Sequence, residues 1–196
     1  MLQLQRAIED LREYLPLLLE AQKKSIEEYH SEYNDQQKFI HTSTTRACII
    51  NDHMKNNLSL VPDLKITKKN RMFLCIIQAD SNIYVIRFKK MDRQGKSGNL
   101  PTIQASLFKS QEPILDFHNS YNLELGYIFS DFGELEDIIL ALPNGNNSPF
   151  WTYSLMFNID TTMNDDMFEQ HNAEPEHVSR FKQKPKDTRV LKNENQ

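Results

Sequence analysis

The residues whose types and spacing could do chemistry lie between Arg87 and Gln104. Five of the side chains between residues 87 and 96 are cations, and one is an acid. Arginine and lysine bind carboxylate and phosphate groups, so this segment predicts recognition of an anion. The candidate binding residues are Arg87, Lys89, Lys90, Asp92, Arg93, Lys96, Ser97, Asn99, Thr102 and Gln104.

This cluster of cations runs against the composition of the chain, which has 196 residues and a formal net charge of −4. Residues 65–96 contain nine basic and two acidic side chains, whereas residues 97–159 contain one basic and seven acidic side chains. A positive segment in an acidic protein faces nucleic acid, an acidic surface of a partner, or acidic segments of the same chain. The sequence leaves these three alternatives open.

No catalytic or metal-binding signature stands out, and the patterns predict no cofactor and do not support an enzyme. A metal-dependent nuclease needs a carboxylate where the chain reads Arg87-Phe88-Lys89. Asp52 and His53 are adjacent on a predicted helix, where consecutive side chains do not face each other. A hydrolase would therefore require folding to bring Asp52, His53 or Asp63 beside acids of residues 116–137. The six histidines lack the spacing of metal ligands.

Cysteine usage and the N-terminal residues predict the compartment. Cys48 and Cys75 stand singly in apolar runs, without a Cys-x-x-Cys pair. We expect both to be small buried hydrophobic residues in a reducing cytosol. The N-terminus has no apolar stretch free of charge, so neither a signal peptide nor a membrane span is expected. These features predict a cytoplasmic protein and say nothing of its oligomeric state.

Helical periodicity dominates the first 60 residues or so. Residues 2–38 place apolar side chains at spacings of three and four. A break or kink is expected near Leu15, because Pro16 removes a backbone donor. A second helix is predicted to begin after an N-cap within residues 42–44 and to end near Asn56.

From Met72 onward the periodicity is that of strands. Tyr84, Ile86 and Phe88 are predicted to face the core, and Gly126 to lie where another side chain packs over its strand. These patterns indicate an α+β fold, with N-terminal helices packed on an antiparallel sheet of about five strands. The expected strands are residues 72–78, 83–90, 122–130, 134–142 and 150–157.

The chain is expected to contain three segments. Residues 1–41 form an N-terminal helical segment, residues 42–159 the α+β core domain, and residues 160–196 a disordered tail. The tail has an acidic block and a basic block with few apolar side chains, so it cannot bury enough surface to offset its ordering entropy. Within the core domain, a short helix after Pro101 is predicted to have Ile103, Leu107 and Phe108 on its inner face.

The chain resembles a family of small bacterial proteins over about residues 42–157. The resemblance depends on the stretch RFKKMDRQGKSGNLPTIQASLF, on the later Leu125-Gly126-Tyr127 and on the turn Pro143-Asn144-Gly145. Its motif positions here are Arg87, Lys89, Lys90, Asp92, Ser97, Asn99, Pro101, Thr102 and Gln104. Members of this family are often encoded beside helix-turn-helix proteins with a metallopeptidase-like domain, in mobile or defence loci. The resemblance implies no established activity.

Two hypotheses for the function follow. The first is a non-catalytic intracellular binding module that docks a protein partner through the basic surface of residues 87–104, with a helix-turn-helix regulator as one candidate. The alternative is a nucleic-acid-binding effector or toxin component of a bacterial two-gene system, which would use the same cations to neutralise phosphates. A toxin–antitoxin pair is the familiar form of such a system.

Overall fold

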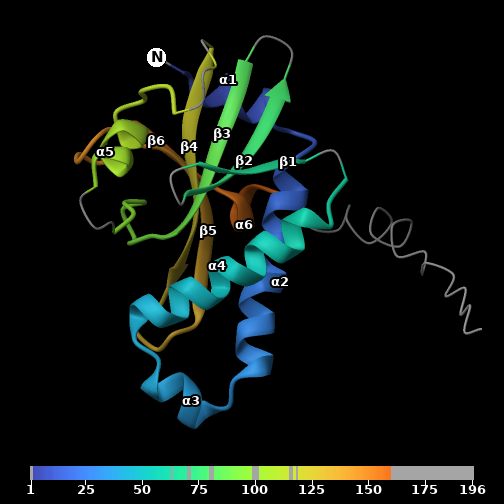
Figure 1. The fold of residues 1–196 in the computed structure, drawn as a ribbon, viewed down its shortest axis with the longest axis vertical. Coiled ribbons are helices and arrows are strands. Elements are labelled where there is room, and N and C mark those ends of the chain that lie inside the picture. Colours follow the sequence, from blue (N-terminus) through green and yellow to red (C-terminus); the bar gives the residue numbers. More distant parts are fainter. Residues whose placement is uncertain are drawn as a thin grey trace, which may run out of the picture. The chain divides into compact units, whose positions relative to one another are not determined.

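The computed structural model describes residues 2–62, 64–69, 72–79, 82–98, 102–114, 117 and 119–159. Asn99, Pro101 and the predicted tail of residues 160–196 lie outside the described residues. Figure 1 shows the elements, which follow in the order α1 (Leu4–Asp10), α2 (Leu15–Glu32), α3 (Asp35–Ile40), α4 (Ser43–Ser59), β1 (Lys65–Lys69), β2 (Met72–Ala79), β3 (Asn82–Lys90), α5 (Ile103–Lys109), β4 (Ser120–Phe129), β5 (Leu135–Leu142), β6 (Trp151–Ser154) and α6 (Leu155–Asn158).

The six strands form one sheet in the order β1-β2-β3-β4-β5-β6. The predicted α+β fold, with N-terminal helices on a mostly antiparallel sheet, is confirmed. The sheet differs from the prediction in one pair, because β3 and β4 run parallel, with Arg87 opposite Glu124 and Lys90 opposite Tyr127. Parallel neighbours need a crossover connection, and the segment between β3 and β4, which contains α5, supplies it.

Two strands differ from the sequence-based prediction. β1 is an additional edge strand that reads KITKK, and its lysines hide the apolar alternation of a strand while they discourage pairing with another chain. β6 is shorter than predicted because Oγ of Ser154 accepts a hydrogen bond from the N–H of Phe157 at 3.2 Å and starts α6. Phe157 is consequently 81% exposed and is not in phase with the strand.

The helix boundaries lie close to the positions that the sequence predicts. α1 ends at Asp10 and α2 begins at Leu15, with Pro16 in its first turn, where a missing N–H costs no helical hydrogen bond. Thr42 caps α4, since its Oγ1 accepts a hydrogen bond from the N–H of Thr45 at 3.1 Å. The predicted N-terminal helical run is therefore divided into α1, α2 and the short helix α3.

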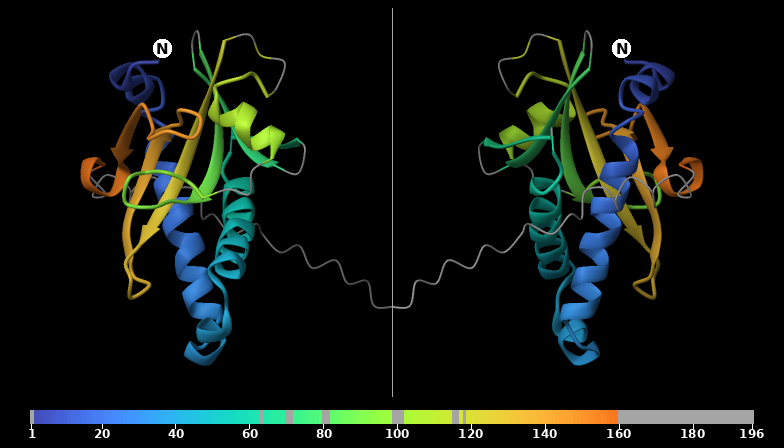
Figure 2. Two further views of the ribbon diagram at one scale, coloured as in Figure 1. Left: turned by 90° about the vertical axis from the view of Figure 1, so that its left-hand side faces the viewer. Right: turned by 90° about the vertical axis from the view of Figure 1, so that its right-hand side faces the viewer.

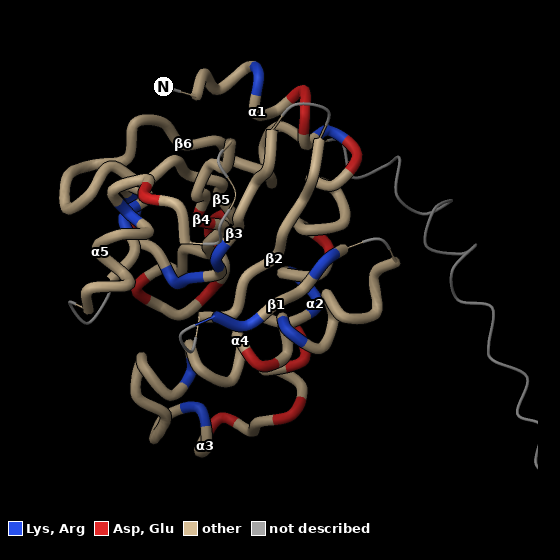
Figure 3. Tube along the Cα trace, turned by 45° about the horizontal axis from the view of Figure 1, so that its top comes forward, with Lys and Arg blue, Asp and Glu red and all other residues tan. Residues whose placement is uncertain are grey.

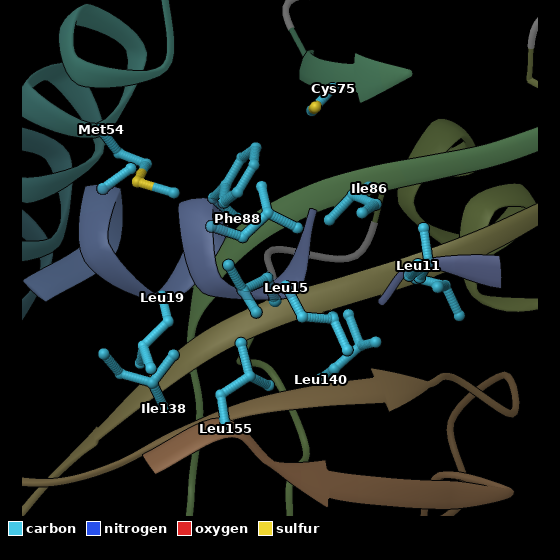
Figure 4. Packing of buried hydrophobic residues seen from close by; sticks show 14 of the residues in the cluster. Leu11, Leu15, Leu19, Met54, Cys75, Ile86, Phe88, Ile138, Leu140 and Leu155 are labelled. Atoms are coloured by element: carbon cyan, nitrogen blue, oxygen red, sulfur yellow. The ribbon is translucent and has the colours of Figure 1, made fainter. Parts of the chain in front are cut away.

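The main hydrophobic core lies between one face of the sheet and the helices α1, α2, α4 and α6. α2 and α4 lie side by side, and both continue past the sheet toward α3 (Figure 2). Because the core takes side chains from residues 1–41 as well as from residues 42–159, both belong to one folded unit. Figure 4 shows how the side chains interlock; among them are Leu11, Leu15, Leu19, Met54, Ile86, Phe88, Ile138, Leu140 and Leu155.

The helix α5 covers part of the opposite face of the sheet. Successive residues of a strand point to opposite faces, so Val85 and Arg87 face away from the main core. The predicted burial of Phe108 is confirmed, but Ile103 and Leu107 are 78% and 38% exposed, and their predicted place on the inner face is wrong. A second, smaller cluster under α5 consists of Leu74, Val85, Phe108 and Ile114.

The carboxylate of Asp10 attaches α1 to β3. Its Oδ2 accepts hydrogen bonds from Nδ2 of Asn82 and Oη of Tyr84, both at 2.7 Å, and Nε of Arg6 lies 2.9 Å from Oδ1. Burial by itself raises the pKa of Asp10, but the hydrogen bonds from Asn82 and Tyr84, together with Arg6, lower the pKa below its ordinary value. The folded state therefore favours the ionised form of this group.

Replacement Tyr84→Phe is expected to lower the free energy of unfolding by about 1 kcal/mol at neutral pH, because it removes a hydrogen bond to a charged acceptor. Since the pKa of Asp10 is lowered on folding, the stabilisation is complete above the ordinary Asp range of about 4 and is lost as the pH falls through the folded-state pKa. Urea unfolding measured across this pH range should show that the difference in the free energy of unfolding between wild type and Tyr84→Phe becomes smaller in acid.

The control for this experiment is Tyr121→Phe. The ring of Tyr121 stacks beside Tyr84 at 6.0 Å, and its hydroxyl makes no hydrogen bond with any residue that the structure describes. This variant should show no such pH dependence. If the free energies of unfolding of wild type and Tyr84→Phe differ by the same amount at neutral and at acid pH, the hydrogen bond from Tyr84 to ionised Asp10 is contradicted.

Candidate functional site

A groove with a volume of about 1360 Å³ opens where β3 ends, and we call it the basic groove. Figure 3 shows lysine and arginine positions at this end of β3, between α4 and α5. α4 forms one wall, the segment of residues 91–98 another, and the start of α5 a third. Among its lining residues are Ala47, Cys48, Lys89, Lys90, Thr102 and Gln104.

The groove exists because β2 leaves β3 before β3 ends. The ladder between β2 and β3 stops at the pair Leu74 and Arg87, whereas the ladder between β3 and β4 continues to the pair Lys90 and Tyr127. The last three residues of β3 therefore have a strand neighbour only on the β4 side. Met72, at the start of β2, lines the groove across this gap.

Arg87, the first of the candidate binding residues, is closed inside the protein. Its guanidinium forms an ion pair with Glu124 of β4, and the two side chains are 5% and 2% exposed. Its Cζ lies 4.8 Å from the centre of the Phe108 ring, an arrangement that favours a cation over an aromatic face. Part of the predicted positive charge is thus neutralised within the sheet.

Arg93 and Asp92 have partners that shape the segment after β3. Nε and Nη2 of Arg93 lie 3.0 and 2.7 Å from the two carboxylate oxygens of Glu136. This paired geometry raises the pKa of Arg93. Oδ1 of Asp92 accepts hydrogen bonds from the N–H groups of Gln94 and Lys96, both at 2.9 Å, and so holds the turn.

Ser97 and Thr102 also have structural contacts. Ser97 is buried, and its carbonyl oxygen accepts a hydrogen bond from Nζ of Lys109 at 2.9 Å. Oγ1 of Thr102 accepts a hydrogen bond from the N–H of Ala105 at 3.1 Å and caps α5. Asn99, between them, lies outside the described residues.

Three lysines of the candidate set differ from Arg87 and Arg93. Lys89, Lys90 and Lys96 have no acid at ion-pair distance among the residues that the structure describes. Nζ of Lys90 lies 3.4 Å from Oγ of Ser43, and Lys96 is exposed. Lys89 is half-buried, and burial, together with the nearby Arg87, lowers its pKa. Three lysines without an acid partner among the described residues therefore line the groove.

Gly126 leaves room for Met91, which lines the groove. Gly126 lies opposite Lys89 in the parallel ladder, and a Cβ at this position would lie 2.5 Å from Cγ of Met91 and 2.7 Å from the carbonyl oxygen of Lys89. Only glycine leaves room for Met91 to pack over the strand here. The predicted role of Gly126 is therefore confirmed.

The prediction that Cys48 is buried is wrong. Cys48 is exposed and lines the groove, whereas Cys75 is buried as predicted. Burial raises the pKa of the Cys75 thiol to about 12, so that thiol stays protonated. α4 packs on α2 and only partly on the sheet, which leaves the Cys48 side of the helix open to the groove.

Two buried polar groups of the groove are not anticipated by the motif. Gln22 and Tyr127 line it at 1% and 3% exposure, and Nε2 of Gln22 and Oη of Tyr127 have no hydrogen-bond partner among the described residues. Burial raises the pKa of Tyr127. The only signal in the sequence is that Gln22 interrupts an apolar helix stripe.

The residues of the hydrolase alternative do not meet. His53 lies between the carboxylates of Glu28 and Glu32 at 3.3 Å from each, and Asp52 pairs with Lys55 on its own helix. Asp63 lies outside the described residues. Within the described ranges, no three His, Cys, Asp or Glu side chains gather in a way that could hold a metal ion.

Two further findings bear on the function. None of the helices in the described part of the chain has the length and apolar character needed to cross a membrane. The chain matches no protein-family model, no curated protein and no solved structure.

Proposed function

We propose that this protein is a non-catalytic binding module that docks a protein partner in the basic groove. The observation that carries the proposal is the set Lys89, Lys90 and Lys96, which have no acid partner within the described residues although Arg87 and Arg93 do. Complementary charge steers a partner and sets its orientation. Unpaired lysines beside apolar walls provide both steering and contact area.

The size and lining of the groove support a polypeptide as the ligand. Its volume of about 1360 Å³ exceeds the range of roughly 300–1,000 Å³ that is typical of small-molecule pockets. Methionine side chains line the groove from α4, from β2 and from the segment after β3. The methionine side chain is flexible and can adapt to the shape of a partner. Of the apolar lining residues, Ala47 and Met72 are partly exposed, whereas Ile50, Met54 and Met91 are buried.

The alternative of a nucleic-acid-binding effector receives less support from the same lining. Single-stranded nucleic acids are bound by exposed aromatic side chains on which bases stack. Of the three aromatic residues that line the groove, Phe88 and Tyr127 are only 5% and 3% exposed, and Phe129 is partly buried.

Partner capture by the full chain tests the proposal. Wild type, the variant Lys89→Glu with Lys90→Glu, and a control variant are purified from the cells that produce the protein. Wild type is expected to retain one protein in stoichiometric amount, and the groove variant is expected to retain at least about tenfold less. The family resemblance makes a helix-turn-helix regulator the first partner to look for.

The control variant is Lys65→Glu with Lys68→Glu. Both lysines are exposed on the edge strand β1 and do not line the groove. Because two lysines are again replaced by two glutamates, the change in net charge equals that of the groove variant. Equal loss of partner in both variants, or a wild-type chain that elutes alone, would overturn the proposal. Release of the bound material by nuclease treatment would favour the nucleic-acid alternative instead.

A further inference from the structure

The face of the sheet under α5 contains more positive than negative charge. Arg87 and Lys89 of β3 and Lys109 of α5 surround one acid, Glu124 of β4. Arg87, Glu124 and Lys109 are buried, with Lys109 8% exposed, and Lys89 is half-buried. The described residues of this cluster therefore hold three cations against one carboxylate.

Of the three cations in this cluster, Lys89 is the one whose charge has no partner among the described residues. Glu124 forms an ion pair with Arg87, and Nζ of Lys109 donates a hydrogen bond to the carbonyl oxygen of Ser97 at 2.9 Å. The ammonium group of Lys89 has no ion pair and no hydrogen bond with the described residues. Holding a cation partly away from water without a counter-charge costs stability. The lowered pKa of Lys89 has the same cause.

The acids near Lys89 are already engaged. Asp92, in the segment that follows β3, uses Oδ1 to hold the N–H groups of Gln94 and Lys96. Cys48 of α4 is the other titratable group that acts on Lys89, together with Arg87, Glu124 and Lys109. Lys89, unlike Lys109, lines the basic groove. A counter-charge for this lysine can therefore come from outside the chain.

We infer that the basic groove binds the carboxylate of an aspartate or glutamate side chain of the partner at Lys89. This inference rests on the proposed function and names the chemistry that the partner must present. The carboxylate accepts a charge-assisted hydrogen bond from the Lys89 ammonium and brings the buried cluster closer to charge balance. Lys90 and Lys96, at the mouth of the groove, favour further acids beside it.

A carboxylate on a peptide fits this site better than the phosphates of a nucleic acid. A nucleic acid presents a regular row of charges and is bound by many cations at once. Here one partly buried ammonium lines a groove whose lining also includes the apolar Met72 and Ala105. Such a setting suits one acidic side chain at Lys89, with further acids of the partner beside Lys90 and Lys96.

Binding of short labelled probes to the full chain tests the inference. The probes are capped pentaglutamate, capped pentaglutamine and pentathymidylate, and fluorescence anisotropy gives their affinities. Pentaglutamate is expected to bind more tightly than pentaglutamine, and Lys89→Gln should weaken it about tenfold, since a hydrogen bond to a charged group is lost. Lys68 is exposed and does not line the groove, so Lys68→Gln should leave the affinity unchanged.

The results that overturn the inference are distinct from those that overturn the proposed function. Equal binding of pentaglutamate and pentaglutamine, or unchanged binding in Lys89→Gln, removes the carboxylate site even if a partner is captured through the groove. Tighter, Lys89-dependent binding of pentathymidylate replaces it with a phosphate site. Lys89-dependent binding of pentaglutamate in a chain that captures no partner removes the proposed function and leaves the site.

Thermal unfolding without any probe gives a second readout. Lys89→Met keeps the aliphatic stem and removes the unbalanced charge, so its melting temperature is expected to equal or exceed that of wild type. Lys109→Met is the matched comparison and is expected to melt lower, because it loses the hydrogen bond to the Ser97 carbonyl. A clear decrease in the melting temperature of Lys89→Met would make Lys89 a structural residue and overturn the inference.

Discussion

Replacement of Arg87 by methionine is expected to lower the free energy of unfolding by about 3–5 kcal/mol. The substitution removes the partner of Glu124, which is 2% exposed and would be left as a buried charge. It also removes the cation that lies over the Phe108 ring of α5. A buried carboxylate that loses its paired cation is costly, because Lys89 and Lys109 lie near Glu124 but neither forms an ion pair with it.

Chemical denaturation of three variants checks this expectation. In the double variant Arg87→Met with Glu124→Leu, most of the lost stability should return, because apolar residues of similar volume can replace a buried ion pair at little cost. Arg93→Met is the control; its pair with Glu136 is exposed to solvent, so its loss should change stability far less. Wild-type stability in Arg87→Met would show that the buried pair does not form.

This expectation changes how binding experiments on the segment should be read. The sequence alone places Arg87 among the cations that hold a ligand. The structure places it beneath α5 in an ion pair, so a loss of binding in Arg87→Ala would also follow from unfolding. Lys89 and Lys90 are the positions at which binding and stability can be separated.

Removal of residues 1–41 is expected to abolish cooperative unfolding, which is the second large effect. Besides Ala7, the segment contributes six large side chains to the main core, each at most 3% exposed. At about 1.5–3 kcal/mol each, their burial is worth about 10 kcal/mol or more, comparable to the whole stability of a typical domain. These side chains are Leu11, Leu15, Leu18, Leu19, Ile26 and Tyr29.

Calorimetry of the truncated chain, residues 42–196, checks the second prediction. A single substitution gives the graded version: Leu18→Ala should lower the free energy of unfolding by about 2–5 kcal/mol. Leu60 is 67% exposed, so Leu60→Ala should change it little and serves as the matched control. A sharp, cooperative transition in the truncated chain would mean that the α+β part folds without its N-terminal helices.

Several parts of the fold could be predicted because their causes are local. Pro16 restricts the backbone wherever it stands, and it marks the start of α2. Thr42 caps α4 through a group only three residues away. The alternation of Tyr84, Ile86 and Phe88 identifies the buried face of β3 without any knowledge of its neighbours.

Other parts depend on neighbours that are distant in sequence. The lysines of β1 give no strand signal, because its pairing with β2 stabilises it and its own pattern does not. Ile103 has the helical spacing of an inner residue, yet α5 rests on the sheet through Phe108 and leaves Ile103 exposed. Cys48 lies on a helix whose sheet-facing side is only partly covered, which opens it to the groove.

The sequence by itself determined that five cations stand between residues 87 and 96, where a buried strand ends. It also determined that Arg87 and Lys89 point to the face opposite Phe88. Only the tertiary structure decided which cations are neutralised. Arg87 meets Glu124 across 37 residues of sequence, and Arg93 meets Glu136 across 43. The first pair depends on the parallel register of β3 and β4, which the crossover through α5 sets, and the second also depends on the pairing of β4 with β5; no local spacing encodes either. This arrangement brings Lys89, Lys90 and Lys96 no acid at ion-pair distance within the described residues.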